Sequence, residues 1–144
     1  MPETPSIRIG AVTYLNTKPL VYQLESLAPQ ATIVYDFPSR LADQLRQGLL
    51  DVALIPTSEL FQNSDYTVLS DACIGCRGPV LSVKLYFRVP VREVQTLSAD
   101  AGSRTSVVLS QVLLQQRAGI RPALTSLPIG QSAADSDADA ILMI

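Results

Sequence analysis

The sequence contains no histidine and no tryptophan, and only two cysteines among its 144 residues. Histidine is the commonest acid–base residue of enzymes and the commonest metal ligand, so any proton transfer has to use other groups. Cys73 and Cys76 cannot supply the roughly four ligands of a zinc site. They precede Gly78-Pro79 and an expected strand rather than a helix, so a structural role is favoured over thiol redox chemistry.

The sequence also shows no excess of one charge, no long apolar run and no visible secretion signal. Eleven Lys and Arg residues oppose 13 Asp and Glu residues, with no basic cluster, which disfavours nucleic-acid binding. No run approaches the roughly 20 apolar residues of a membrane span. The first residues carry neither the basic nor the apolar region of a secretion signal. We therefore expect a cytoplasmic protein without a membrane or nucleic-acid partner, and the sequence leaves its oligomeric state open.

Strand and helix patterns alternate in the first half of the chain. Three short apolar stretches predict buried strands, at residues 6–12, 31–37 and 51–55. Leu20, Leu24 and Leu27 have the i, i+4, i+7 spacing of an amphipathic helix. Ser39 is the expected N-cap of a second helix, which should stop at Gly48. This alternation predicts right-handed βαβ crossovers and a largely parallel sheet.

The second half of the chain has a different pattern. Residues 80–89 predict a long strand that crosses out of the first lobe, and residues 96–100 predict a short strand that opens a second lobe. Ser103 or a close neighbour should cap a helix that ends at Gly119. The apolar pairs of this helix have i, i+4 spacing: Val108 with Val112, and Leu109 with Leu113.

Residues 140–144, "AILMI", have a buried-strand sequence at the end of the chain. Apolar residues at a free end would form an unpaired, exposed strand. We therefore expect the natural chain to continue. The expected organisation is an α/β fold with a first lobe over residues 1–89 and the first part of a second, incomplete lobe over residues 90–144.

Polar segments follow three of the expected strands. Ligands of open parallel sheets bind beyond the carboxyl ends of the strands, where residues 13–16, 56–59 and 102–106 should lie. The third segment opens a helix whose N–H groups suit a carboxylate, and Arg104 adds a cation. These segments predict a cleft for a small acidic molecule. Taken singly, the same residues are as well explained by helix caps, a turn before Pro19 and a short helix after Pro56.

Three stretches resemble the MqnA family of menaquinone biosynthesis, the chorismate dehydratases. They are "RIGAVTYLNTKPL", "PSRLADQLRQGLLDVALIPTSEL" and "GPVLSVKLYFRVPVREVQTLSADAGSRTSVVL". The resemblance implies a fold like that of type 2 periplasmic binding proteins, with two α/β lobes joined by two crossover strands. It also implies a cytoplasmic lyase of the futalosine pathway, which converts chorismate into 3-[(1-carboxyvinyl)oxy]benzoate without a metal or organic cofactor.

The resemblance also assigns roles to individual residues. Asn16 of the "YLN" motif is the implied catalytic residue in the substrate cleft, and Ser82 is placed near the hinge. The implied carboxylate site contains Ser103, Thr105 and Ser106. Position alone adds four further candidates for substrate binding: Tyr14, Thr57, Ser58 and Arg104.

Two questions about the reaction stay open at this level. The proton acceptor is either the substrate's own enolpyruvyl carboxylate, held by Asn16, or a protein base, for which Glu59 is the nearest candidate. The function is either the dehydratase or one of two alternatives on the same fold. These are a non-catalytic binding protein for a small carboxylate and the sister 1,4-dihydroxy-6-naphthoate synthase, which uses a histidine.

Overall fold

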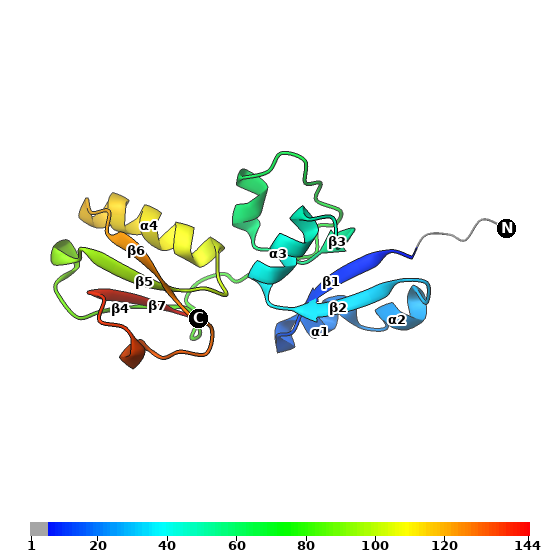
Figure 1. Ribbon diagram of the computed structural model, residues 1–144, viewed down its shortest axis with the longest axis horizontal. Coiled ribbons are helices and arrows are strands. Elements are labelled where there is room, and N and C mark those ends of the chain that lie inside the picture. The colour runs from blue at the N-terminus through cyan, green and yellow to red at the C-terminus, as the bar shows by residue number, and fades with distance from the viewer. Residues whose placement is uncertain (1–5) are drawn as a thin grey trace. The chain divides into compact units, whose positions relative to one another are not determined.

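The structure, a computed structural model, describes residues 6–144. The chain divides into two compact units, Met1–Gly75 and Cys76–Ile144, each with its own sheet and helices (Figure 1). Most strand pairs are parallel, which confirms a mixed α/β fold with mostly parallel sheets. The expected lobe over residues 1–89 extends further than the first unit, and its residues 1–5 lie outside the described part.

The first sheet contains the three strands expected from the sequence. They are β1 (Arg8–Val12), β2 (Thr32–Asp36) and β3 (Val52–Ala53). Their order is β2-β1-β3, with both neighbours parallel to the central β1. Gly10 pairs with Val34 on one side and with Ala53 on the other. The carboxyl ends of all three strands therefore lie at one edge of the sheet.

Helix α3 (Pro38–Arg46) covers one face of this sheet. Its Leu41 is fully buried and forms a core with Val12 and Leu50. The helix ends as predicted, because Gly48 takes the left-handed conformation with φ 70°. The predicted cap is wrong: the N-cap is Phe37, no side chain caps it, and Ser39 is buried inside the first turn.

The first predicted helix is broken into two short ones. Helices α1 (Lys18–Val21) and α2 (Leu24–Leu27) are separated at Gln23, whose φ is 57°. The hydroxyl of Ser26 donates to the Gln23 carbonyl at 2.8 Å, which closes a separate turn and competes with a continuous helix. Leu27 consequently points into solvent and is 75% exposed, so the predicted leucine stripe does not form one buried face.

Gly10 of β1 lies where the core of the first unit is most crowded. A Cβ atom there would lie 2.7 Å from Leu50 Cδ1, 2.9 Å from Leu41 Cδ2 and 3.0 Å from Ala53 Cβ. Gly10→Ala should therefore lower the free energy of unfolding by about 1–3 kcal/mol through overpacking. Gly75→Ala is the control, because its Cβ would meet only Cys73 Sγ at an ordinary 3.7 Å. Equal melting temperatures for the two variants would contradict this packing.

An ion pair joins β1 to the segment before β3 at the amino edge of the sheet. The Arg8 guanidinium donates to Asp51 through Nη2 at 2.8 Å and Nε at 3.0 Å, and the Arg8 backbone N–H donates at 2.8 Å. These side-chain and backbone hydrogen bonds lower the pKa of Asp51 from 3.8 to about 2. The carboxyl therefore stabilises the fold above pH 3.8, and this contribution is lost as the pH falls through about 2.

Asp51→Asn should consequently melt at a lower temperature than the wild type at neutral pH. The difference should shrink between pH 3.8 and about 2, where the wild-type carboxyl takes up its proton. Melting curves over a pH series at low salt measure it, and added salt should reduce the difference because both side chains are partly exposed. A difference that does not depend on pH would show that the charge of Asp51 is not the cause.

The second sheet has four strands in the order β4-β7-β5-β6. They are β4 (Lys84–Phe87), β5 (Thr96–Asp100), β6 (Ala123–Leu127) and β7 (Ala140–Met143). β5 is parallel to β6 and β7, whereas β4 is antiparallel to β7. The segment predicted as a crossover strand thus pairs within the second unit.

The buried strand predicted at the end of the sequence is present as β7. The sequence analysis expected its neighbours to be missing from this chain, but β7 pairs with both β4 and β5. Ala140, Ile141 and Leu142 are buried. The strand is thus an interior element of the second sheet.

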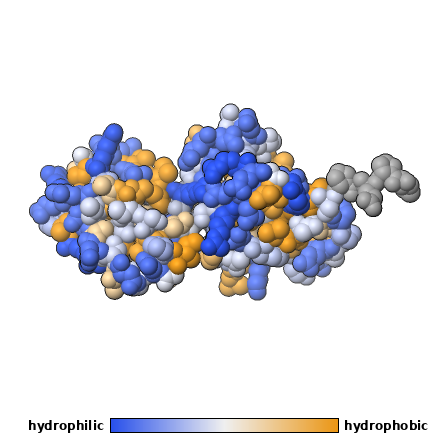
Figure 2. Space-filling model, in the orientation of Figure 1, coloured by the Kyte–Doolittle hydropathy of each residue, from blue (hydrophilic) through white to orange (hydrophobic). Residues whose placement is uncertain are grey.

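Helix α4 (Thr105–Ala118) packs on this sheet and ends at Gly119, whose φ is 73°, as predicted. Its Leu114 is buried with Leu97 and Leu142 in the core of the second unit. The apolar pairs singled out in the sequence lie largely outside this core: Val108, Leu109, Val112 and Leu113 are exposed. Figure 2 shows apolar residues, in orange, on the surface over α4.

Asp139 fixes the amino edge of β5 next to the start of β7. Its carboxylate accepts hydrogen bonds from the backbone N–H of Gln95 and Thr96 and from the Thr96 hydroxyl, at 2.9, 2.9 and 3.0 Å. These bonds lower the pKa of Asp139.

Two short 3₁₀ helices complete this unit, η3 (Val91–Glu93) and η4 (Ala133–Asp135). Within residues 6–144, no helix is long and apolar enough to cross a membrane. Cys73 and Cys76, which precede β4, are exposed, free thiols. The structural role predicted for them is therefore wrong, since neither side chain packs in a core.

Candidate functional site

The turn after β1 carries the Tyr14 and Asn16 side chains at the carboxyl edge of the first sheet. The Thr13 N–H donates to the Asp36 carbonyl at 3.2 Å, which extends the pairing of β1 with β2 by one residue. The 3₁₀ helix η1 (Leu15–Thr17) then starts, and the Thr17 N–H donates to the Tyr14 carbonyl at 3.1 Å. Asn16 is exposed, so its carboxamide is accessible to a ligand at this edge.

A second turn reaches the same edge from the neighbouring strand β3. The 3₁₀ helix η2 (Thr57–Phe61) follows Pro56, and the Glu59 N–H donates to the Pro56 carbonyl at 3.0 Å. Thr57 is exposed, but Ser58 and Glu59 are only 5% and 3% exposed. In this conformation Thr57 is therefore the accessible hydroxyl of the segment, whereas Ser58 and Glu59 are turned into the protein.

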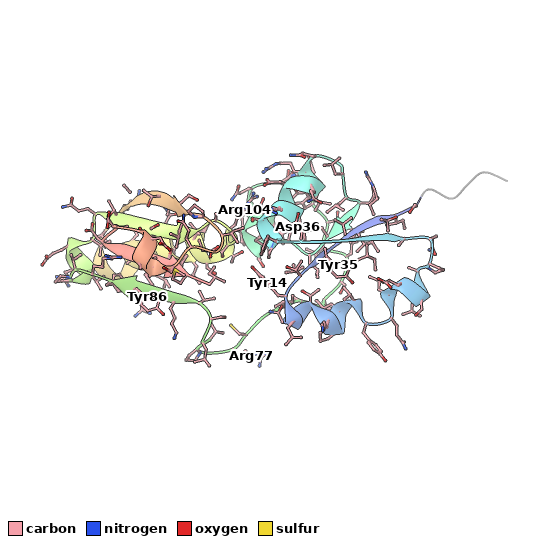
Figure 3. All side chains as sticks on the ribbon, turned by 60° about the horizontal axis from the view of Figure 1, so that its bottom comes forward. Tyr14, Tyr35, Asp36, Arg77, Tyr86 and Arg104 are labelled. Atoms are coloured by element: carbon pink, nitrogen blue, oxygen red, sulfur yellow. The ribbon has the colours of Figure 1, made fainter. Side chains whose placement is uncertain are left out.

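The end of β2 adds functional groups that the sequence analysis missed. The rings of Tyr14 and Phe37 meet edge to face with centroids 6.2 Å apart. The Arg40 guanidinium lies 5.4 Å from the centre of the Phe37 ring and 3.5 Å from the Asp36 carboxylate. Gln44 also donates to Asp36, at 3.0 Å. Figure 3, where Tyr14 and Asp36 are labelled, shows this part of the first unit.

The same rule that selected Asn16 also points to Asp36. Asp36 is the last residue of β2, a parallel strand next to β1, so its side chain belongs to the same carboxyl edge. The missed signal was the sequence "YDFPSR", in which an acid, an aromatic ring and a cation follow the strand. Arg40, whose guanidinium lies over the Phe37 ring, adds a positive charge to this edge.

In the second unit, a tight turn connects β5 to helix α4. The Asp100 carboxylate accepts from the Gly102 N–H at 2.7 Å, and the Asp100 carbonyl accepts from the Ser103 N–H at 3.2 Å. A Cβ on Gly102 would lie 2.9 Å from the Asp100 carboxylate, so the turn favours glycine. It places Ser103 and Arg104 at the carboxyl edge of β5.

Helix α4 starts where the sequence predicted, next to Ser103. Its N-cap is Arg104, and no side chain caps the helix there. Thr105 is exposed, whereas Ser103, Arg104 and Ser106 are half-buried. The positive end of the α4 dipole therefore lies beside the side chains of residues 103–106, at the carboxyl edge of β5.

Ser82 reaches the same edge by a route that the sequence did not reveal. Because β4 is antiparallel to β7, the first residue of β4, Lys84, pairs with Met143 at the carboxyl end of β7. Ser82 precedes Lys84 by two residues and is exposed. All candidate residues of the second unit thus lie at one sheet edge, as do those of the first unit at theirs.

The described residues offer no evident metal centre. Among residues 6–144, no three His, Cys, Asp or Glu side chains are grouped so that they could hold a metal ion. The functional groups at the two sheet edges are hydroxyls, a carboxamide, phenol and guanidinium groups, and carboxylates. Such groups bind and orient a polar, anionic organic molecule through hydrogen bonds.

A family model matches a stretch of the chain that spans both units. A sequence model described as menaquinone biosynthesis matches residues 7–144, which include every candidate site residue. This agrees with the family expected from the three sequence stretches. The chain therefore belongs to the menaquinone biosynthesis family.

Proposed function

We propose that the protein is a chorismate dehydratase that forms 3-[(1-carboxyvinyl)oxy]benzoate in the futalosine pathway. The observation that carries this proposal is the exposed Asn16 on η1, directly after the central strand of a parallel sheet, in a chain of the menaquinone biosynthesis family. A carboxamide donates to a carboxylate and accepts from a hydroxyl at the same time. Chorismate carries both groups.

The proposed reaction removes the hydrogen at C3 and the hydroxyl at C4 of chorismate. The electron pair of the C3–H bond completes the aromatic ring, and the C4 hydroxyl leaves with a proton as water. Because the aromatic product is much more stable, the protein has mainly to orient the substrate and to assist proton movement.

The substrate's own enolpyruvyl carboxylate is the proposed proton acceptor, and Asn16 is proposed to hold it near C3. Burial favours this assignment over Glu59: Asn16 is exposed at the sheet edge, whereas Glu59 is 3% exposed. A general base has to come within hydrogen-bond reach of the proton that it removes. Glu59 would first have to leave its buried position.

The remaining candidates are assigned to substrate binding. Tyr14, Thr57 and Ser58 are proposed to contribute from the first unit. The residues proposed from the second unit are Ser82, Ser103, Arg104, Thr105 and Ser106. The proposal includes a fold like that of type 2 periplasmic binding proteins, which two separate α/β units with polar carboxyl edges support.

Thr105→Ala and Ser106→Ala test the proposed carboxylate site at the start of α4. Each variant should weaken substrate binding by about 1.5–3 kcal/mol, the usual value of a hydrogen bond to a charged group. Isothermal titration calorimetry with the reaction product as ligand avoids turnover during the measurement. Ser110→Ala, which removes a hydroxyl bound to the Val107 carbonyl inside the same helix, is the control. Unchanged affinity in both test variants would leave the start of α4 without a role in binding.

The proposed activity is tested by incubating the full-length protein with chorismate. We expect an aromatic product whose mass is lower than that of chorismate by one water. Binding of unchanged chorismate would indicate the non-catalytic binding protein instead. If chorismate neither binds nor reacts, the proposal is wrong, and the sister synthase becomes the candidate to assay, although this sequence has no histidine.

A further inference from the structure

Arg40 lies in the first turn of helix α3, where a cation is unfavourable for the helix. Phe37 is the N-cap, so Arg40 is the third helical residue. The N–H groups at this end of a helix carry a partial positive charge, which a guanidinium opposes. Arg46, in the last turn, has the position that the dipole favours. Arg40 is thus poorly placed for the stability of α3, and local exceptions of this kind are typical of functional positions.

Two neighbours hold the Arg40 guanidinium at the carboxyl edge of the first sheet. It lies 3.5 Å from the carboxylate of Asp36, the last residue of β2, and 5.4 Å from the centre of the Phe37 ring. The Asp36 carboxylate is itself fixed, because it accepts from the Phe37 N–H at 2.8 Å and from Gln44 at 3.0 Å. The guanidinium is therefore positioned before a ligand arrives, which lowers the entropic cost of binding one.

This positioned guanidinium is nevertheless open to solvent. The Arg40 side chain is 61% exposed, whereas that of Asp36 is 20% exposed. A guanidinium has five N–H donors in a planar fork, and the contact with Asp36 is made by Nη1. The other donors can bind a carboxylate through two parallel hydrogen bonds, a geometry that arginine offers and lysine does not.

Two aromatic rings connect Arg40 to the turn that carries Asn16. The Phe37 ring meets the Tyr14 ring edge to face, with centroids 6.2 Å apart, and Tyr14 directly precedes η1, which contains Asn16. Tyr14 and Asp36 are labelled in Figure 3. Tyr14 is 41% exposed and Phe37 is half-buried, so apolar ring surface lies beside the cation. A flat ring that carries a carboxylate matches both features.

We propose that Arg40 binds the ring carboxylate of the substrate and makes the site selective for ring acids. The inference rests on the proposed function, in which Asn16 holds the other, enolpyruvyl carboxylate. Arg40 is not assigned to that carboxylate, because a guanidinium beside it would lower its pKa and weaken it as a proton acceptor. The ring carboxylate takes no part in proton transfer, so the same charge can hold it without this cost.

The test compares Arg40→Gln with Arg46→Gln in the full-length protein. Both variants remove from α3 a guanidinium that pairs with a neighbouring acid. Isothermal titration calorimetry uses the reaction product, which carries both carboxylates. Arg40→Gln should bind it about tenfold more weakly than the wild type, the lower end for a hydrogen bond to a charged group. Arg46→Gln should bind it like the wild type.

A second ligand, 2-phenoxyacrylate, identifies the carboxylate. It keeps the enolpyruvyl carboxylate and the ring but lacks the ring carboxylate. Arg40→Gln and the wild type should bind it equally, because the cycle of variant and ligand isolates the one contact. Thermal melts complete the comparison. Arg40→Gln should melt near the wild-type temperature, since its ion pair is largely exposed and its charge opposed the helix dipole.

Three outcomes would overturn the proposal, and they separate it from the proposed function. If Arg40→Gln binds the product as tightly as the wild type does, Arg40 does not contact the substrate, whereas the proposed function stands. If Arg40→Gln loses as much affinity for 2-phenoxyacrylate as for the product, the ring carboxylate is not its partner. If the wild type does not bind the product, the proposed function fails and this inference fails with it.

Discussion

Asn16→Ala should lower the rate of chorismate turnover by roughly 10²–10³-fold, the usual cost of losing one preorganised hydrogen-bond donor in an active site. The melting temperature should hardly change. Asn16 is exposed on η1, so its carboxamide is hydrated in the empty protein and alanine leaves no buried polar group without a partner. Steady-state assays and thermal melts of the full-length variant measure both quantities.

Asn16→Asp is the more informative variant because it nearly preserves the shape of the side chain. The ionised carboxylate only accepts hydrogen bonds, and it places a negative charge opposite a substrate that is itself a dianion. Its loss of turnover should therefore be at least as large as that of Asn16→Ala. Near-normal turnover in both variants would show that Asn16 only shapes the turn after β1.

Glu59→Gln separates the two proposed proton acceptors. Glutamine keeps the volume of this buried side chain, and the substrate-assisted route predicts that turnover is largely retained. Loss of nearly all activity, with an unchanged melting temperature, would contradict substrate assistance and identify Glu59 as the base. Comparing Glu59→Gln with Asn16→Asp on one substrate therefore tests the two assignments independently.

Local sequence patterns predicted those elements whose signals are themselves local. Short stretches of strand-like sequence predicted β1, β2 and β5. Glycines that take positive φ just after α3 and α4 predicted where these helices end. The helix after Asn16 was mispredicted because the leucine spacing carries no information about Gln23. Its left-handed conformation and the hydrogen bond from Ser26 interrupt the helix.

The candidate site was predictable to the extent that it depends on strand ends. The rule that ligands bind at carboxyl ends selected Asn16, Thr57 and the turn before α4. Applied to β2, it would also have selected Asp36, with Arg40 one helical turn later. Burial of Glu59 was not predictable, because it depends on how η2 folds back, which no short motif specifies.

The pairing of β7 was not predictable because its partners are distant in the sequence. Leu142 pairs with Leu85 on one side and with Ala99 on the other. Its apolar composition predicts a buried strand but does not identify the strands with which it pairs. Only the closure of the sheet shows that β7 is an interior strand with partners along both edges.

Leu142→Ala tests the interior position of β7 and should cause a large loss of stability. Leu142 is 3% exposed and packs with Leu97 and Leu114, so its truncation leaves a cavity and should cost about 2–5 kcal/mol. An unpaired, exposed terminal strand would instead lose less than about 0.5 kcal/mol. Urea denaturation followed by circular dichroism measures the change.

The control for Leu142→Ala is Ile144→Ala in the same stretch of chain. Ile144 lies just beyond β7 and is 40% exposed, so this variant should unfold close to the wild type. Gly10→Ala supplies a second comparison, because it crowds the core of the first unit and not of the second. If each unit has its own transition, Leu142→Ala should shift one and Gly10→Ala the other. Equal, small effects of Leu142→Ala and Ile144→Ala would contradict the interior position of β7.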